Sequence, residues 1–180
     1  MIKPLARYFM KRAIKDSDRS PSLVQGAHIR DVAIVAVYQP GESFSHINTY
    51  VKEWRKRGMR SVDLFLYFTN KKSLDAYQGF PKDIPFMRKD FNFAGKAVSD
   101  ELVSGLKKEY DVLIDLSRGA AFPCDVVISK INAKWKAGEQ HDDRSYLLDL
   151  MIDLKGDPDV RKLIHHMDHY LVNLNTSNAA

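Results

Sequence analysis

The chain has 180 residues, one cysteine, 44% hydrophobic residues and a formal net charge of +5. This length suits one domain that buries a core without disulfides, and the composition excludes a disordered chain and a disulfide scaffold. No apolar run reaches the roughly 20 residues that span a bilayer, and the N-terminus lacks the apolar region of a secretory signal. A cytoplasmic location is therefore expected.

The excess of basic charge lies at the N-terminus. Residues 1–15 hold five basic residues and no acidic one, which leaves 23 basic and 23 acidic residues elsewhere. Ile2, Leu5, Phe9 and Ala13 recur at helical spacing. We therefore expect a basic amphipathic helix and a linker over residues 1–26, an α/β domain over 27–175 and a frayed tail at 176–180.

The expected N-terminal helix has a narrow apolar face, with Phe9 as its main anchor. Packing onto its own domain, onto a second copy of the chain or onto a protein partner is the favoured role. Contact with an anionic membrane surface is a less favoured alternative. Nucleic-acid binding is disfavoured because it requires a basic face on the fold itself.

Short β-branched runs alternate with amphipathic segments through the rest of the chain. Strands are expected at 32–38, 61–68, 84–87, 112–116 and 133–137, and helices at 44–56, 99–108, 124–131 and 158–174. A helical turn is expected near 74–77, and segment 146–154 reads as a sixth strand or a short helix. This alternation predicts a Rossmann-like α/β fold, with a mainly parallel sheet of about five or six strands flanked by helices.

The stretch Asp111–Pro123, D-V-L-I-D-L-S-R-G-A-A-F-P, contains the strongest functional signal. An apolar strand ends there in a carboxylate, a hydroxyl, a cation and a glycine, where open α/β sheets bind ligands. The predicted ligand-binding residues are Asp115, Ser117, Arg118 and Gly119. Asp115 would orient a hydroxyl or act as a base, and Arg118 would pair with an anion. Turn and cap hydrogen bonds are the favoured alternative role for Asp115 and Ser117.

The loop after the first strand, Y-Q-P-G-E-S-F-S at 38–45, would form the other side of this crevice. It lacks G-x-G-x-x-G, and G-x-x-x-x-G-K-[ST] is absent from the chain, so no nucleotide cofactor is expected. Ser43 and Ser45, with the first N–H groups of the next helix, are candidates for holding a small anion. In a doubly wound order the first and fourth strands are often neighbours, which would place both loops at one crevice.

Other reactive side chains give weaker signals. Cys124 reads as a small core residue rather than a reactive thiol, and Ser117 has no G-x-S-x-G context. His165 and His169 are four residues apart, but both point away from the apolar face of the last helix. No H-E-x-x-H motif accompanies them, so no metal site is expected.

Several motifs carry a resemblance. They are F-M-R-K-D at 86–90, Y-D-V-L-I-D-L-S at 110–117, F-P at 122–123, A-K-W-K-A-G at 133–138, the segment at 146–153 and Y-L at 170–171. Their order resembles a bacterial family of short α/β proteins of unknown function. The motifs at 110–117 and 133–138 are also similar to the N-terminal, acceptor-side half of heptosyltransferase-like GT-B glycosyltransferases. Those enzymes bind the sugar nucleotide on a second domain, so this resemblance implies an acceptor-side half without glycosyl transfer of its own.

No complete catalytic motif is present. The leading hypothesis is therefore a non-catalytic binding or assembly module without a cofactor. The alternative is a small-ligand-binding protein or enzyme that acts on a phosphorylated or sugar-like anion at the crevice.

Overall fold

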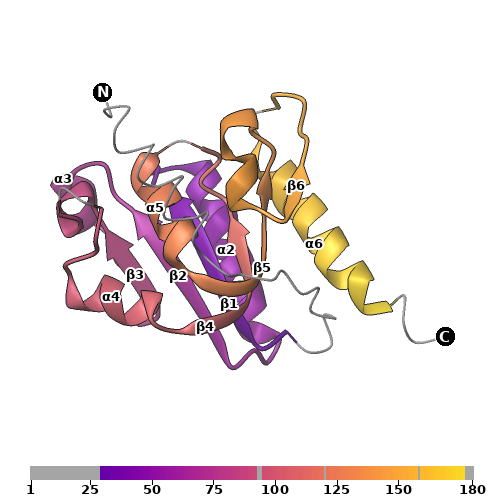
Figure 1. Ribbon diagram of the computed structural model, residues 1–180, viewed down its shortest axis with the longest axis horizontal. Coiled ribbons are helices and arrows are strands. Elements are labelled where there is room, and N and C mark those ends of the chain that lie inside the picture. Colours follow the sequence, from indigo (N-terminus) through magenta and orange to yellow (C-terminus); the bar gives the residue numbers. More distant parts are fainter. Residues whose placement is uncertain (1–28, 93–94, 120, 158, 177–180) are drawn as a thin grey trace.

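The computed structural model describes residues 29–92, 95–119, 121–157 and 159–176 of the chain. Its centre is a six-stranded sheet in which every strand pairing is parallel (Figure 1). The strands are β1 (Asp31–Val37), β2 (Ser61–Tyr67), β3 (Asp83–Phe86), β4 (Glu109–Asp115), β5 (Asn132–Glu139) and β6 (Leu150–Ile152). The Rossmann-like α/β prediction is confirmed. The expected N-terminal helix and linker lie outside the described residues.

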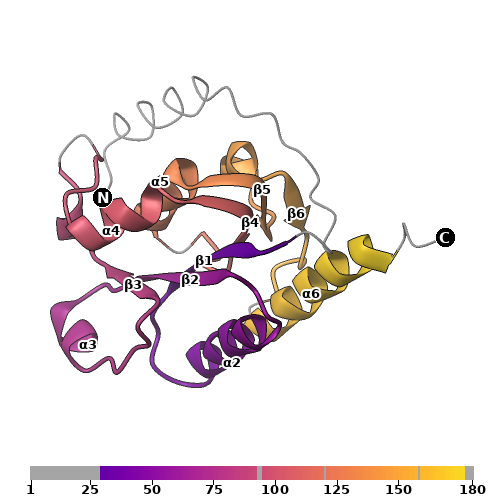
Figure 2. The ribbon, with the colours of Figure 1, turned by 90° about the horizontal axis from the view of Figure 1, so that it is seen from below.

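The helices follow the strands along the chain. They are α2 (Glu42–Lys56), α3 (Lys71–Asp75), α4 (Asp100–Leu106), α5 (Phe122–Lys130) and α6 (Val160–Thr176), with short 3₁₀ segments η2 (Arg88–Asp90) and η3 (Asp142–Leu147). Figure 2 shows α2 and α6 on one face of the sheet and α4 and α5 on the other. Both faces are therefore covered, as a parallel sheet requires.

The strand order is β3-β2-β1-β4-β5-β6. From β1 the chain builds the sheet outward through β2 and β3, then returns to the centre and builds the other half from β4 to β6. Asp115, the last residue of β4, lies opposite Val35 of β1. The expectation that the first and fourth strands are neighbours is thus confirmed, and their junction is the topological switch point of the sheet.

The central strands are buried on both sides. Residues 32–36 of β1 and 112–115 of β4 have no exposed surface. One core lies under α2 and α6, around Trp54, Phe68 and Leu163, and the other lies under α4 and α5, around Phe65 and Leu113. This two-sided burial explains why both strands read as continuous apolar runs rather than as alternating ones.

Several element boundaries differ from those expected. Helix α2 begins at Glu42 rather than at residue 44, because its first turn is polar and gives no periodic signal. Helix α3 begins three residues before the turn expected near 74–77 and overlaps its first two residues. Segment 146–154 contains the end of η3 and then β6, so the strand alternative is confirmed in shortened form. Strand β5 continues past residue 137 because Gly138 and Glu139 pair with Met151 and Ile152.

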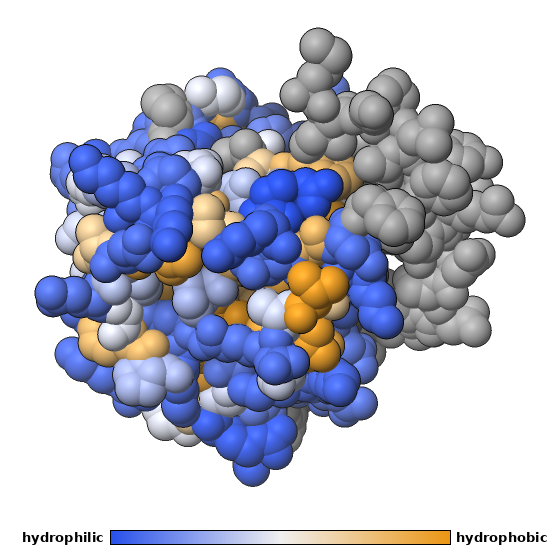
Figure 3. Space-filling model, turned by 90° about the vertical axis from the view of Figure 1, so that its left-hand side faces the viewer, coloured by the Kyte–Doolittle hydropathy of each residue, from blue (hydrophilic) through white to orange (hydrophobic). Residues whose placement is uncertain are grey.

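The surface beside β3 is mostly polar. Figure 3 shows this side of the molecule, where hydrophilic residues predominate and apolar ones lie in separate groups. Phe80 is 40% exposed there, beneath the cationic groups of Lys52 and Arg55. None of the described helices combines the length and the apolar character that crossing a membrane requires.

Candidate functional site

Arg144 is the centre of a buried cluster of ion pairs at the carboxyl end of β4. Its Nη2 lies 2.9 Å from Asp115 Oδ2, and its Nε donates to Asp125 Oδ1 at 2.8 Å. Asp115 has no exposed surface and Arg144 is 4% exposed. Asp115 Oδ1 also accepts a 2.8 Å hydrogen bond from the backbone N–H of Ser117. Asp115 therefore holds the turn and neutralises Arg144, with neither oxygen facing an open crevice.

Gly138 makes room for this arrangement. It lies opposite Asp115 in the pairing of β4 with β5. A Cβ added at Gly138 would lie 3.0 Å from Asp115 Cβ and 2.8 Å from Leu148 Cδ1. The glycine that ends the A-K-W-K-A-G motif thus has a packing role beside the predicted site.

Arg118 is paired with Glu139 of β5. Its Nε and Nη2 donate to the two carboxylate oxygens at 2.6 and 3.0 Å, and Nη2 also donates to the Asp157 carbonyl at 2.7 Å. The hydrogen bond to Glu139, which is 5% exposed, raises the pKa of Arg118. Arg118 (φ 54°) and Gly119 (φ 68°) are both left-handed, so the chain reverses sharply here. The predicted anion-binding cation thus already has a bidentate carboxylate partner.

Two buried nitrogens beneath this turn lack hydrogen-bond partners. They are Arg144 Nη1 and His141 Nε2. His141 Nε2 lies 3.6 Å from Glu139 Oε2, which is too long for a hydrogen bond. A Cβ added at Gly119 would lie 3.4 Å from Arg144 Nη1, so the backbone of the turn covers the guanidinium.

The charges of the cluster do not favour an anion. Asp115, Asp125 and Glu139 supply three carboxylates against the two guanidinium groups of Arg118 and Arg144, in two sets of ion pairs beside the same turn. With His141 neutral the cluster has a formal charge of −1. A phosphate would therefore meet cations that are already more than neutralised.

Ser43 and Ser45 lie in the first turns of α2 and are exposed. Ser45 N donates to the Gly41 carbonyl at 3.2 Å, and Gly41 caps the helix without a side-chain hydrogen bond. Helix α2 covers one face of the sheet, whereas the turn at 115–119 leads into α5 on the other. The two loops of the predicted site thus continue into helices on opposite faces of the sheet.

Cys124 is completely buried in α5. Burial raises its pKa well above the ordinary value, and the neighbouring charges of Asp115 and Asp125 add to this rise. A protonated thiol is a poor nucleophile, so the core role expected for Cys124 is the one its surroundings support.

Sequence reasoning missed Arg144, Asp125 and Glu139 as members of the site. In sequence the run H-D-D-R at 141–144 looks like a solvated charged turn, but Arg144 is buried. The available signal was Asp125, a carboxylate inside the apolar helix C-D-V-V-I, because such a buried charge requires a partner.

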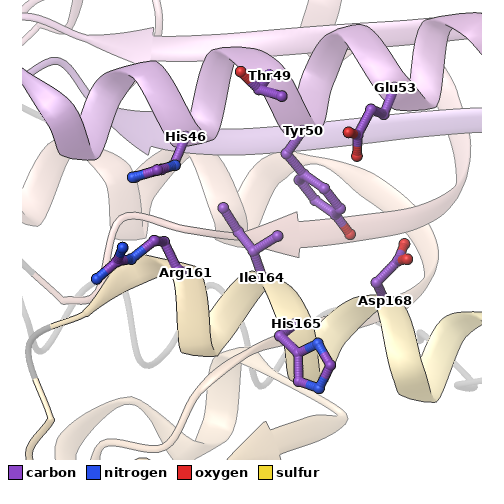
Figure 4. A pocket seen from close by; sticks show the side chains of 8 residues that line it. All are labelled: His46, Thr49, Tyr50, Glu53, Arg161, Ile164, His165 and Asp168. Carbon is purple, nitrogen blue, oxygen red and sulfur yellow. The ribbon is translucent and has the colours of Figure 1, made fainter.

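A groove of about 280 Å³ lies between α2 and α6 (Figure 4). Three cross-helix pairs line it: His46 with Arg161, Tyr50 with Ile164, and Glu53 with Asp168. Thr49 and His165 complete the lining. His165 is exposed, as its position on the outer side of α6 predicts. Within the described part of the chain, no three His, Cys, Asp or Glu side chains are grouped closely enough to hold a metal ion.

Comparison with known proteins assigns a family but no activity. Residues 4–174 match the model of a family of unknown function, DUF6913, and the chain belongs to this family. No curated protein and no solved structure matches the chain.

Proposed function

We propose that this member of a family without an assigned activity is a non-catalytic binding or assembly module. The observation that carries the proposal is the pairing at the switch point. Asp115 and Arg118, the predicted base and the predicted anion-binding residue, are held in buried ion pairs with Arg144 and Glu139. A general base or an anion clamp must instead reach its ligand directly.

Further features support this proposal. Strands β4 and β5, which carry the two motifs similar to GT-B glycosyltransferases, are neighbours in the sheet. Those enzymes bind their donor on a second domain, so the resemblance favours a module without chemistry of its own. The single free cysteine suits a reducing compartment, and we propose a cytoplasmic location.

Ligand screening by thermal unfolding tests the non-catalytic proposal. The full chain is heated with phosphate, sugar phosphates, nucleotides and nucleotide sugars, each at 1 mM. A ligand present at 100 times its Kd would stabilise the protein by about 2.7 kcal/mol, which is a visible shift. We expect no shift with any of them. A shift that Arg118→Ala abolishes and Lys162→Ala preserves would contradict the proposal.

That contradictory result would support the second candidate function, a small-anion-binding protein or enzyme. One observation favours this candidate: the unpaired Arg144 Nη1 and His141 Nε2 lie beneath the turn that carries Arg118. The excess of carboxylates in the same cluster disfavours it.

We further propose that assembly uses the basic segment at residues 1–15, through self-association or a protein partner. Light scattering after size exclusion measures the mass of the full chain. If the segment mediates self-association, that mass should exceed the mass of a monomer. If it binds a protein partner, the tagged full chain should capture that partner, and the complex should have the larger mass. Lys11→Glu with Arg12→Glu should reduce that mass. The matched control is Lys71→Glu with Lys72→Glu, which makes the same charge change on the exposed surface of α3. A monomer that captures no partner would contradict the assembly role.

A further inference from the structure

We propose that residues 2–13, the expected amphipathic helix, pack their apolar stripe onto the outer face of α5 in the same chain. The outer face of α5 consists of Phe122, Val126 and Ser129. This docking goes beyond the assembly proposal, which concerns the basic side chains of the same segment, and it can hold or fail independently of that proposal. It follows from the burial of α5 and from the length, pattern and reach of the segment.

Helix α5 is enclosed on all sides. Of its nine residues, Lys130 alone is exposed. Helix α2, on the other face of the sheet, instead exposes a polar stripe that consists of Ser45, Thr49, Lys52 and Lys56. A helix that flanks a sheet normally shows such a stripe to water, whereas a helix without one is covered on both sides. Helix α5 therefore has a neighbour beyond the sheet.

The missing neighbour lies over the outer face of α5. Cys124, Val127 and Ile128 have no exposed surface and form the side of α5 that faces the sheet. At 100° per residue, the outer face lies roughly 150–170° around the helix from that side. Val126 is nevertheless only 3% exposed. A residue that points away from the sheet is thus covered almost as completely as the core.

The outer face suits an apolar cover. The Ser129 hydroxyl donates a hydrogen bond to the Val126 carbonyl at 2.8 Å, so its polar group is satisfied within the helix. Asp125, on the flank of α5, is paired with Arg144. An apolar partner can therefore pack here without leaving a polar group of this face unpaired.

The other described elements do not supply this cover. Helix α5 has its main contacts with β1, on the sheet side, and with η3, whose Arg144 reaches only the flank. Figure 2 shows no labelled helix or strand beyond α5 on its face of the sheet. The rest of the chain consists of residues 1–28 and of stretches no longer than four residues. Only residues 1–28 are long enough to cover a helix of nine residues. Because this burial holds for a single copy, the cover comes from the same chain.

The N-terminal segment fits this place in pattern, length and reach. Its expected apolar stripe consists of Ile2, Leu5, Phe9 and Ala13. Such a stripe is roughly 17 Å long on a helix, against about 14 Å for α5. Residues 14–28 span up to about 50 Å when extended, and they lead to the amino end of β1, which packs against α5. The match to the family also begins within this segment, at residue 4.

Docking through the stripe would separate the apolar and basic sides of the segment. Arg7, Lys11 and Lys15 lie roughly 140–220° around the expected helix from Ile2, so they would face water. The apolar side would be occupied by α5, which leaves the basic side for contacts with an assembly partner.

Disulfide trapping in the full chain tests the docking. Ala6→Cys and Ala13→Cys, at two points of the stripe, are each combined with Ser129→Cys and oxidised. We expect at least one pair to close within a single chain, about 10-fold faster or more than the control pair, Lys11→Cys with Ser129→Cys. The native Cys124 does not compete, because it is completely buried.

A second measurement uses the largest side chain of the stripe. Phe9→Ala should lower the unfolding temperature by about 4 °C or more, because it removes a packed ring, and Lys11→Ala should leave that temperature unchanged. Three outcomes would overturn the docking: equal rates for the stripe and control pairs, a disulfide that joins two chains, or an unchanged unfolding temperature for Phe9→Ala.

The docking and the assembly proposal fail in different ways. A disulfide between two chains would overturn the docking and support self-association. A disulfide within one chain, in a protein that is a monomer and captures no partner, would support the docking and contradict the assembly role.

Discussion

Arg144 pairs with two buried carboxylates at once, and this contact decides what the switch point can do. Asp115 comes from the end of β4 and Asp125 from the first turn of α5, so one guanidinium joins two elements. Removing one member of such a cluster leaves uncompensated charge in the core. Breaking a buried pair in this way typically costs about 3–5 kcal/mol.

Replacing Arg144 by methionine should therefore lower the free energy of unfolding by about 3–5 kcal/mol in urea denaturation. The control, Lys162→Ala, removes the cation of the exposed Asp157–Lys162 pair and should have a much smaller effect. Adding Asp115→Asn and Asp125→Asn to Arg144→Met should recover part of the loss, because the uncompensated charges are gone. If Arg144→Met were no worse than Lys162→Ala, the cluster would not be the buried contact described above.

The sequence predicted where these residues would lie better than it predicted what they contact. The apolar run that ends in D-L-S-R-G marked the end of a strand and a tight turn, and both are present. The partner of Asp115 lies 29 residues later in a charged run, and nothing local distinguishes a buried arginine there from a solvated one. The groove between α2 and α6 also requires two helices far apart in the chain, so periodicity alone could not reveal it.

At the amino ends of the strands, opposite the switch point, four strands each carry a buried aspartate that is paired with a cation. Asp31, Asp63, Asp83 and Asp111 lie at or near the starts of β1, β2, β3 and β4, and each is less than 10% exposed. Each is paired with a cation from a neighbouring element: Arg60, Lys108, Arg55 and Lys134, respectively. The strands are thus anchored at their amino ends by ion pairs between a buried carboxylate and a cation, and three of these cations, Arg60, Lys108 and Lys134, have side chains that are more than half exposed.

Asp111 makes this anchoring sensitive to acid. Burial opposes its ionisation, but hydrogen bonds from Lys134 and from the backbone N–H groups of Arg30 and Asp31 outweigh burial and lower its pKa. A lowered pKa in the folded state stabilises the protein above the unfolded pKa, near pH 4, and that stability is lost as the pH falls through the folded value.

Asp111→Asn should therefore be less stable than the natural protein at pH 7 and at pH 5, and the difference should shrink as the pH falls below about 4. Urea denaturation at pH 7, 5 and 3 measures it. Asp75→Asn, on the exposed side of α3, serves as the control. A stability difference that stays constant from pH 7 to pH 3 would show that Asp111 does not contribute through its charge.

At the scale of the whole molecule, the alternation of strands and helices was enough to predict the fold class. The apolar runs of β1 and β4 were found because burial on both faces leaves an unbroken signal, whereas β2, which Asp63 interrupts, was found as a weakly alternating segment. Beyond the pairing of the first strand with the fourth, the strand order was not predictable, since it depends on which way each crossover turns after leaving the sheet. The short edge strands were also hard to delimit: β6 has three residues, and β3 has four with Pro85 among them.

The junction of β1 with β4 has a consequence for the order in which the chain folds. Within each half of the sheet, neighbouring strands are joined by one crossover, but the Arg30–Asp31 backbone reaches Asp111 across 80 residues of sequence. Closing that longer loop costs about 1 kcal/mol more in chain entropy than closing a crossover of about 30 residues. We expect the two halves to form first and the seam between β1 and β4 to close last. The contacts of Asp111 with the Arg30–Asp31 backbone would then be completed only in the final, rate-limiting encounter of two preformed halves. The switch-point cluster, whose members all lie between residues 115 and 144, would form earlier, within one half.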